Sequence, residues 1–102
     1  MKIRTQSINF NANTDLLKFI EKKTALLEKF YDKILDIEIF LKVQKTSNKE
    51  NKHTEIKLNI PGDEFIIKKI TKTFEEGISI SVDSLKRQLR KAKEKQRDFS
   101  AS

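Results

Sequence analysis

The chain has 102 residues, of which 36% are hydrophobic and 36% are charged, with no cysteine and a single histidine. This length fits one domain with a small hydrophobic core. The lack of cysteine excludes disulfides, thiolate metal sites and thiol chemistry, and one histidine excludes sites that need two imidazoles. The apolar runs are too short to span a membrane, and Met1–Thr5 lacks the apolar stretch of a signal peptide, so we expect a cytoplasmic protein.

The first half of the chain predicts a strand, a helix and a second strand. Residues 2–10 contain β-branched and apolar residues without Gly or Pro, which favours a strand. Asn13 or Thr14 can cap a helix, which the spacing of apolar residues predicts over about 14–32. Over 37–44, Ile37, Ile39, Leu41 and Val43 alternate strictly with Glu38, Phe40, Lys42 and Gln44, the pattern of a strand with one buried face.

The second half predicts two more strands and a long helix. The polar run 45–52 reads as a hairpin loop, and alternation returns in a third strand around 56–60. Pro61-Gly62 supplies a turn before a fourth strand over about 65–70. Apolar residues then recur every three or four positions and predict a helix over about 74–96. They are Phe74, Ile78, Val82, Leu85, Leu89 and Ala92.

The predicted order β-α-β-β-β-α defines an α+β fold. A right-handed crossover through the first helix makes strands one and two parallel, and the remaining strands form an antiparallel meander. Because the alternation leaves only one apolar sheet face, both helices should cover that face of a four-stranded mixed sheet. We therefore expect a two-layer sandwich in which 1–97 form a single domain and 98–102 a frayed tail.

The positive charge of the chain is concentrated at the end of the last predicted helix. Residues 86–97 hold seven cations against one anion, a net charge of +6 out of +7 for the chain. Like charges at four-residue spacing repel one another without helping the fold, which favours a polyanionic partner over a merely solvated surface. The candidate contacts on this helix are Lys86, Arg87, Arg90, Lys91, Lys93, Lys95 and Arg97.

The first predicted helix carries a smaller basic group that includes Lys22 and Lys23. Lys23 falls near the middle of the apolar stripe, so its ammonium should reach the edge of the packing surface. The start of the last helix is acidic at Glu75 and Glu76, which favours contact with the backbone of structured RNA over reading of base edges. Membrane binding would need apolar residues that are free to insert, and here they cover the sheet.

Catalysis finds little support. The acidic pairs Glu75-Glu76 and Asp63-Glu64 are adjacent in sequence and cannot flank one bond, and His53 reads as a structural or surface residue. With two glycines, the chain has no glycine-rich phosphate loop. We expect a binding protein that needs no cofactor, no metal and no small-molecule substrate.

Four segments, taken in order, resemble the ribosome hibernation-promoting factor family, also known as ribosomal subunit interface or sigma-54 modulation proteins. Leu27–Ile34 is similar to the family's L-E-K-Y-x-D-R-I stretch, and Leu85–Lys91 to its K-L-x-R-Q-L-x-K helix. His53–Leu58 is similar to its third strand, and Pro61-Gly62 to the turn that follows. The resemblance covers nearly the whole chain and implies a fold similar to double-stranded-RNA-binding domains.

The resemblance also implies a function: binding of the small ribosomal subunit near the decoding region, which blocks tRNA and mRNA and promotes ribosome hibernation in stress. By position, the cationic contacts of the family correspond to Lys23, Arg87, Lys91 and Lys95. Leu26 stands where many relatives have a basic residue, and Thr73–Glu75 replace the usual Asp-Met-Tyr. The chain resembles a short form, ending without a dimerising domain, and should be monomeric off the ribosome.

Three hypotheses follow from these observations. The favoured one is a non-enzymatic translation inhibitor whose partner is ribosomal RNA of the small subunit. The second is a general double-stranded RNA or DNA binder that uses the same cations without ribosome specificity. The third is an interaction module whose basic helix docks on an acidic protein.

Overall fold

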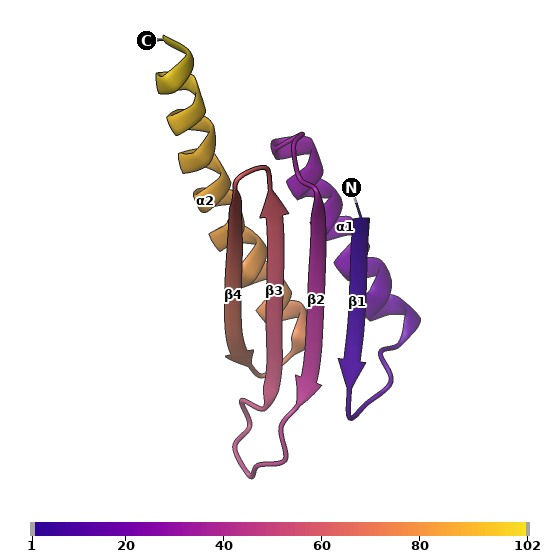
Figure 1. Ribbon diagram of the computed structural model, residues 1–102. Coiled ribbons are helices and arrows are strands. Elements are labelled where there is room, and N and C mark those ends of the chain that lie inside the picture. The colour runs from indigo at the N-terminus through magenta and orange to yellow at the C-terminus, as the bar shows by residue number, and fades with distance from the viewer. Residues whose placement is uncertain (1, 102) are drawn as a thin grey trace.

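Four strands form one sheet, and two helices cover one of its faces (Figure 1). The computed structural model describes the backbone of residues 2–101 and the side chains of residues 2–95. In chain order the elements are β1 (Lys2–Ile8), α1 (Thr14–Phe30), β2 (Asp36–Val43), β3 (Lys52–Ile60), β4 (Asp63–Thr71) and α2 (Phe74–Ala101). The predicted α+β order and the two-layer arrangement are therefore confirmed.

The sheet has the order β1-β2-β3-β4, with β1 parallel to β2 and the other neighbours antiparallel. The register places Ile37 opposite Leu58 and Ile39 opposite Ile56, and all four side chains are buried. Because side chains alternate between the two faces of a strand, this pairing gathers the apolar residues of the central strands beneath the helices. The opposite face of the sheet stays open to solvent.

Helix α1 begins where a side chain satisfies its first free backbone amide. The amide of Leu16 donates to Asn13 Oδ1 at 2.8 Å, so Asn13 is the cap and Thr14 is the first helical residue. The buried face includes Thr24, whose hydroxyl donates to the carbonyl of Ile20 at 2.8 Å. A polar residue is thus accommodated in the apolar stripe because its hydroxyl is satisfied within the helix.

The first strand is shorter than the sequence predicts. It ends at Ile8, and Asn9 adopts a positive φ of 68° that turns the chain away from the sheet. Phe10, predicted as part of the strand, instead stacks on Phe74 at the start of α2, with ring centroids 4.7 Å apart. The aromatic contact leaves Phe10 partly buried against the core.

Helix α2 approaches the sheet closely at Gly77. A Cβ at this position would lie 2.6 Å from Thr54 Oγ1 and 3.0 Å from Thr71 Oγ1. Glycine lowers helix propensity by about 1 kcal/mol relative to alanine, and here it permits the contact between the helix and the sheet. The helix also continues to Ala101, past its predicted end near 96. The division into a domain over 1–97 and a frayed tail from 98 stays a prediction, and Ser102 lies outside the described residues.

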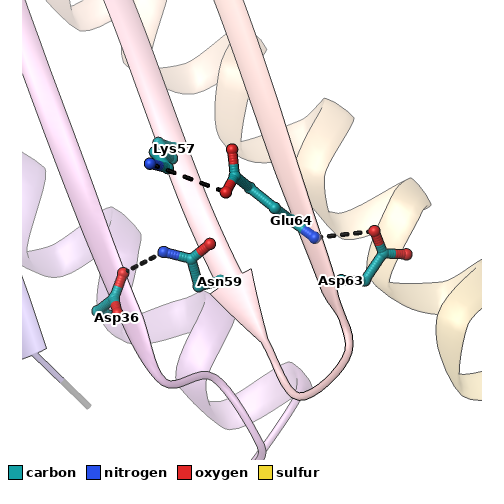
Figure 2. A network of polar contacts seen from close by, with 5 residues as sticks. All are labelled: Asp36, Lys57, Asn59, Asp63 and Glu64. Atoms are coloured by element: carbon teal, nitrogen blue, oxygen red, sulfur yellow. Dashed lines mark hydrogen bonds and ion pairs between the residues drawn. The ribbon is translucent and has the colours of Figure 1, made fainter.

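Polar residues on the open face of the sheet pair across strands (Figure 2). Asn59 donates to Asp36 Oδ1 at 2.6 Å, and Lys57 Nζ lies 3.8 Å from Glu64 Oε2. A second ion pair joins Lys68 Nζ to Glu55 Oε1 at 3.4 Å. No helix in the described part of the chain combines the length and the apolar character needed to cross a membrane.

Candidate nucleic-acid interface

Helix α2 has a buried apolar side and, over its C-terminal half, an exposed side that carries cations. The predicted stripe is confirmed: Phe74, Ile78, Val82, Leu85 and Leu89 are all buried against the sheet or α1. The cations between and beyond these residues lie off the apolar stripe. Arg87, Arg90, Lys91 and Lys95 are exposed, and Lys86 is half-buried. The apolar stripe therefore fixes the orientation of the helix and leaves these cations accessible.

Within residues 2–95, whose side chains the structure describes, no carboxylate forms an ion pair with these cations. In the part of the chain with described side chains, both ion pairs lie on the open face of the sheet, at Lys57–Glu64 and Lys68–Glu55. Glu94, the one anion within the basic run, is exposed and makes no ion pair there. A group of uncompensated cations on a rigid helix produces a positive potential that attracts polyanions.

The exposed cations of α2 point in different directions. Lys91 and Lys95 border a hollow of about 300 Å³ beside the start of β4, whose Asp63 and Phe65 line its other side. Arg87 and Arg90 border a second hollow, of about 450 Å³, together with Lys91 and Glu94. The guanidinium of Arg87 also donates to Ser84 Oγ at 3.1 Å, which limits the directions it can take. The cationic surface therefore wraps around α2.

Lys93 has a different role from the other predicted contacts. Its ammonium donates to the backbone carbonyl of Phe30 at 2.9 Å and lies 5.0 Å from the centroid of the Phe30 ring. Phe30 is the last residue of α1, where carbonyls lack helical partners and the helix dipole favours a cation. Lys93 thus joins α2 to the end of α1, and its predicted contact with RNA stays a prediction.

The two basic residues predicted on α1 occupy different environments. Lys22 is exposed, whereas Lys23 is half-buried and its ammonium lies 5.6 Å from the centroid of the Phe19 ring. This contact confirms that Lys23 runs along the margin of the apolar stripe with its charge at the edge. Lys23 and Phe30 are seven residues apart and so share one side of α1, as Lys86 and Lys93 share one side of α2.

The contact between Lys93 and Phe30 brings these two sides together. The helices run in the same direction in Figure 1, and their C-terminal halves lie toward the same end of the molecule. By helical periodicity, Lys23 and Lys86 lie seven residues before Phe30 and Lys93, each on the same side of its helix. The contact between Lys93 and Phe30 therefore joins two helices that both carry cations and that lie more than sixty positions apart in the sequence.

The side chain of Arg97 lies outside the described residues, so its candidate role stays a prediction. Lys29 is exposed in the last turn of α1, next to Phe30, and was not among the predicted contacts. Its neighbours Glu28 and Asp32 make that stretch of the sequence look neutral.

No cluster of three or more metal-ligating side chains occurs within the described residues. The acidic pair Asp63-Glu64 is engaged locally, because Asp63 Oδ1 accepts from the Glu64 amide at 2.8 Å while the Glu64 carboxylate is directed to Lys57 (Figure 2). The two carboxylates therefore do not converge on one point. The geometry of the described residues favours binding of an anionic surface by α2 and α1.

Comparison with known proteins agrees with this fold and with the resemblance in sequence. The family model described as sigma 54 modulation protein / S30EA ribosomal protein matches residues 3–97. The ribosome hibernation promoting factor of Pseudomonas putida is 30% identical over 99 residues, which cover 97% of this chain and 93% of that protein.

Two solved structures share the fold at lower sequence identity. The ribosomal subunit interface protein from Coxiella burnetii has a TM-score of 0.79 and 22% identity, over 91% of this chain and 98% of that one. The N-terminal domain of Thermus thermophilus Protein Y has a TM-score of 0.76 and 22% identity, over 89% and 98% respectively. At this identity the likeness supports the fold. With the family match spanning nearly the whole chain, the protein belongs to the ribosome-associated sigma 54 modulation protein / S30EA ribosomal protein family.

Proposed function

We propose that this protein inhibits translation by binding the small ribosomal subunit near the decoding region, where it blocks tRNA and mRNA and promotes ribosome hibernation. The observation that carries the proposal is the uncompensated cationic surface of α2, presented by a buried apolar stripe in a member of a ribosome-associated family. The name of the Pseudomonas putida relative supports the link to hibernation.

In this proposal the protein acts by occupancy and not by catalysis. Arg87, Arg90, Lys91 and Lys95 contact phosphates of ribosomal RNA, because cations on a helix side suit backbone contacts. Lys22, Lys23 and Lys86 extend the contact toward α1, and Arg97 extends it along α2. The cationic surface lies within one chain, so the protein binds as a monomer. Because its partner is the ribosome, the protein acts in the cytoplasm.

Sedimentation with purified small subunits tests the proposal against a general affinity for nucleic acids. Binding to the subunit and to a free RNA duplex is measured across a salt series, since phosphate contacts release counterions and weaken with salt. We expect the subunit to be preferred at moderate salt. Equal affinity for any duplex would support the hypothesis of a general nucleic-acid binder. Lack of binding to both the subunit and the duplex would support the hypothesis of an acidic protein partner.

A charge-reversal pair tests the surface itself. Arg87→Glu with Lys91→Glu should abolish subunit binding while the fold is retained, because both side chains are exposed and point away from the apolar stripe. Lys45→Glu with Lys49→Glu is the matched control, with the same change in net charge on exposed residues of the β2–β3 loop. Retained binding in the first variant, or equal loss in both, would refute the assignment to α2.

A further inference from the structure

Strand β4 forms one edge of the sheet and is long and partly apolar. It spans nine residues and is hydrogen-bonded to β3 alone, so its other side offers backbone groups without a neighbouring strand. Ile66 and Ile70 project from it with 51% and 47% of their surfaces exposed. Edge strands of this kind pair with an additional strand unless charges or irregular geometry prevent it.

The sequence of β4 is complementary to itself in the antiparallel direction. It reads as two acids, three apolar residues and two lysines, in the order Asp63-Glu64-Phe65-Ile66-Ile67-Lys68-Lys69. In an antiparallel pair centred on Ile66, residues equally distant from Ile66 come to lie opposite each other. Asp63 then faces Lys69, Glu64 faces Lys68 and Phe65 faces Ile67 of the second copy, and every charged residue meets its opposite.

This register is selected by the charges. A shift of the centre by one residue to Ile67 places Phe65 opposite Lys69 and Ile66 opposite Lys68, which loses both charge pairs. Like every antiparallel register centred on a residue, it keeps residues of the same face together, with half-buried Phe65 and Ile67 on the helix side and exposed Ile66 on the open side. A two-fold axis through Ile66 generates this pairing, which is the isologous arrangement of symmetric dimers.

The charged residues concerned are accessible for such contacts. Asp63 and Lys69 are exposed and take part in no ion pair within the described residues. Glu64 and Lys68 pair with Lys57 and Glu55, but their side chains remain 45% and 64% exposed. In the dimer, Lys68 would lie between Glu55 of its own chain and Glu64 of the second copy, so signs alternate along the combined row (Figure 2 shows Glu64 on this face).

We propose that β4 is a self-association surface through which two copies of this chain form an antiparallel β4–β4 dimer with Ile66 at the two-fold axis. The contact involves one strand from each copy, so the dimer is weak and forms at high protein concentration. Under this proposal, the expected monomer off the ribosome is the form present at low protein concentration, in equilibrium with the dimer. The inference uses no residue of α2 and does not depend on binding of RNA.

Sedimentation velocity measures the association directly. The wild-type chain is examined from about 10 μM to about 1 mM, a range that covers weak dissociation constants. We expect the weight-average mass to rise toward twice that of the monomer. Ile66→Lys places two ammonium groups together at the axis and should leave a monomer over the whole range, while circular dichroism confirms that the exposed position does not disturb the fold.

An exchange of charges tests the register. Lys69→Asp places two acids opposite each other on both sides of the axis and should weaken the dimer by about 10-fold or more. Asp63→Lys combined with Lys69→Asp restores opposite charges and should recover the association. Lys72→Asp, the same charge change on an exposed residue just beyond β4, is the matched control and should associate like the wild type.

The possible outcomes decide the proposal. Recovery in the doubly exchanged variant, together with loss in Ile66→Lys, establishes antiparallel pairing in this register. A wild-type chain that stays monomeric at the highest concentration overturns it, and then Lys68 and Lys69 serve only to keep the edge from pairing. Association that survives both Ile66→Lys and Lys69→Asp also overturns it, because the contact must then lie elsewhere.

Discussion

The cations of α2 and those on the open face of the sheet occupy opposite electrostatic situations. On the sheet, Lys57 and Lys68 each lie within 4 Å of a carboxylate on the neighbouring strand. On α2, Arg87, Arg90 and Lys91 have no such partner among the described residues. The sheet face therefore presents balanced charge, while α2 presents excess charge. A polyanion site is therefore indicated by cations that lack compensating acids, and not by the number of lysines.

The largest expected effect is on binding to the small subunit, when two cations of α2 are neutralised and compared with two neutralised cations of the sheet. Arg87→Gln with Lys91→Gln should weaken binding to the small subunit by about 10- to 100-fold and reduce the salt dependence by about two counterions. Lys57→Gln with Lys68→Gln removes the same charge from the sheet and should change both quantities little. Fluorescence anisotropy with labelled protein across a salt series measures them. Equal salt dependence of subunit binding in the two double variants would contradict the difference between α2 and the sheet.

Substitution of Gly77 tests how the helix layer is seated on the sheet. Gly77→Ala adds a Cβ that would lie 2.6 Å from Thr54 Oγ1, and Thr54 is fully buried. We expect the free energy of unfolding to fall by about 1–2 kcal/mol despite the better helix propensity of alanine. Urea denaturation measures the change. Asp83→Ala, an exposed substitution on the same helix, should stay within about 0.5 kcal/mol, and a stabilised Gly77→Ala would refute the close approach.

Lys93 and Lys95 separate the structural role of a cation from its binding role. Lys93→Met removes the bond to the Phe30 carbonyl and the cation–ring contact, so stability should fall by about 1 kcal/mol. Lys95→Met removes an exposed cation with no ion pair in the described residues and should leave stability nearly unchanged. Thermal unfolding distinguishes them. Equal stability of the two variants would mean that the Lys93 contact contributes nothing.

The smallest expected effect concerns the sheet ion pairs. Glu55→Gln breaks the pair with Lys68, whose side chain is 64% exposed. Exposed pairs contribute little because water and salt screen them, so the free energy of unfolding should fall by about 0.2–0.5 kcal/mol. Urea denaturation at low and high salt checks this value. A loss above about 1 kcal/mol would show that the sheet face is held by its charges more strongly than screening allows.

The secondary structure was predictable because short-range patterns determine it. Alternation at Ile37–Val43 and the spacing of Phe74, Ile78 and Val82 each report which side of an element is buried. The predicted end of the first strand was wrong because Asn9 adopts a left-handed conformation. Phe10 then found an aromatic partner in Phe74, far along the chain, and no local pattern carries that information.

The candidate site was predicted only in part. The exposure of Arg87, Arg90 and Lys91 follows from the position of the apolar stripe, so periodicity was sufficient. The contact of Lys93 with the end of α1 was missed, because it depends on how close the Phe30 carbonyl lies to α2. Lys29 was missed because Glu28 and Asp32 make that stretch of the sequence look neutral.

The order of the elements, the apolar face of each and the concentration of charge in residues 86–97 follow from the sequence alone. These features depend on contacts within a few residues along the chain, and periodicity reports them directly. Packing between the elements sets which described cations lack an ion pair, which one joins the helices and why Gly77 is tolerated in a helix. Those outcomes depend on the distance between elements, which is set when the helices pack on the sheet.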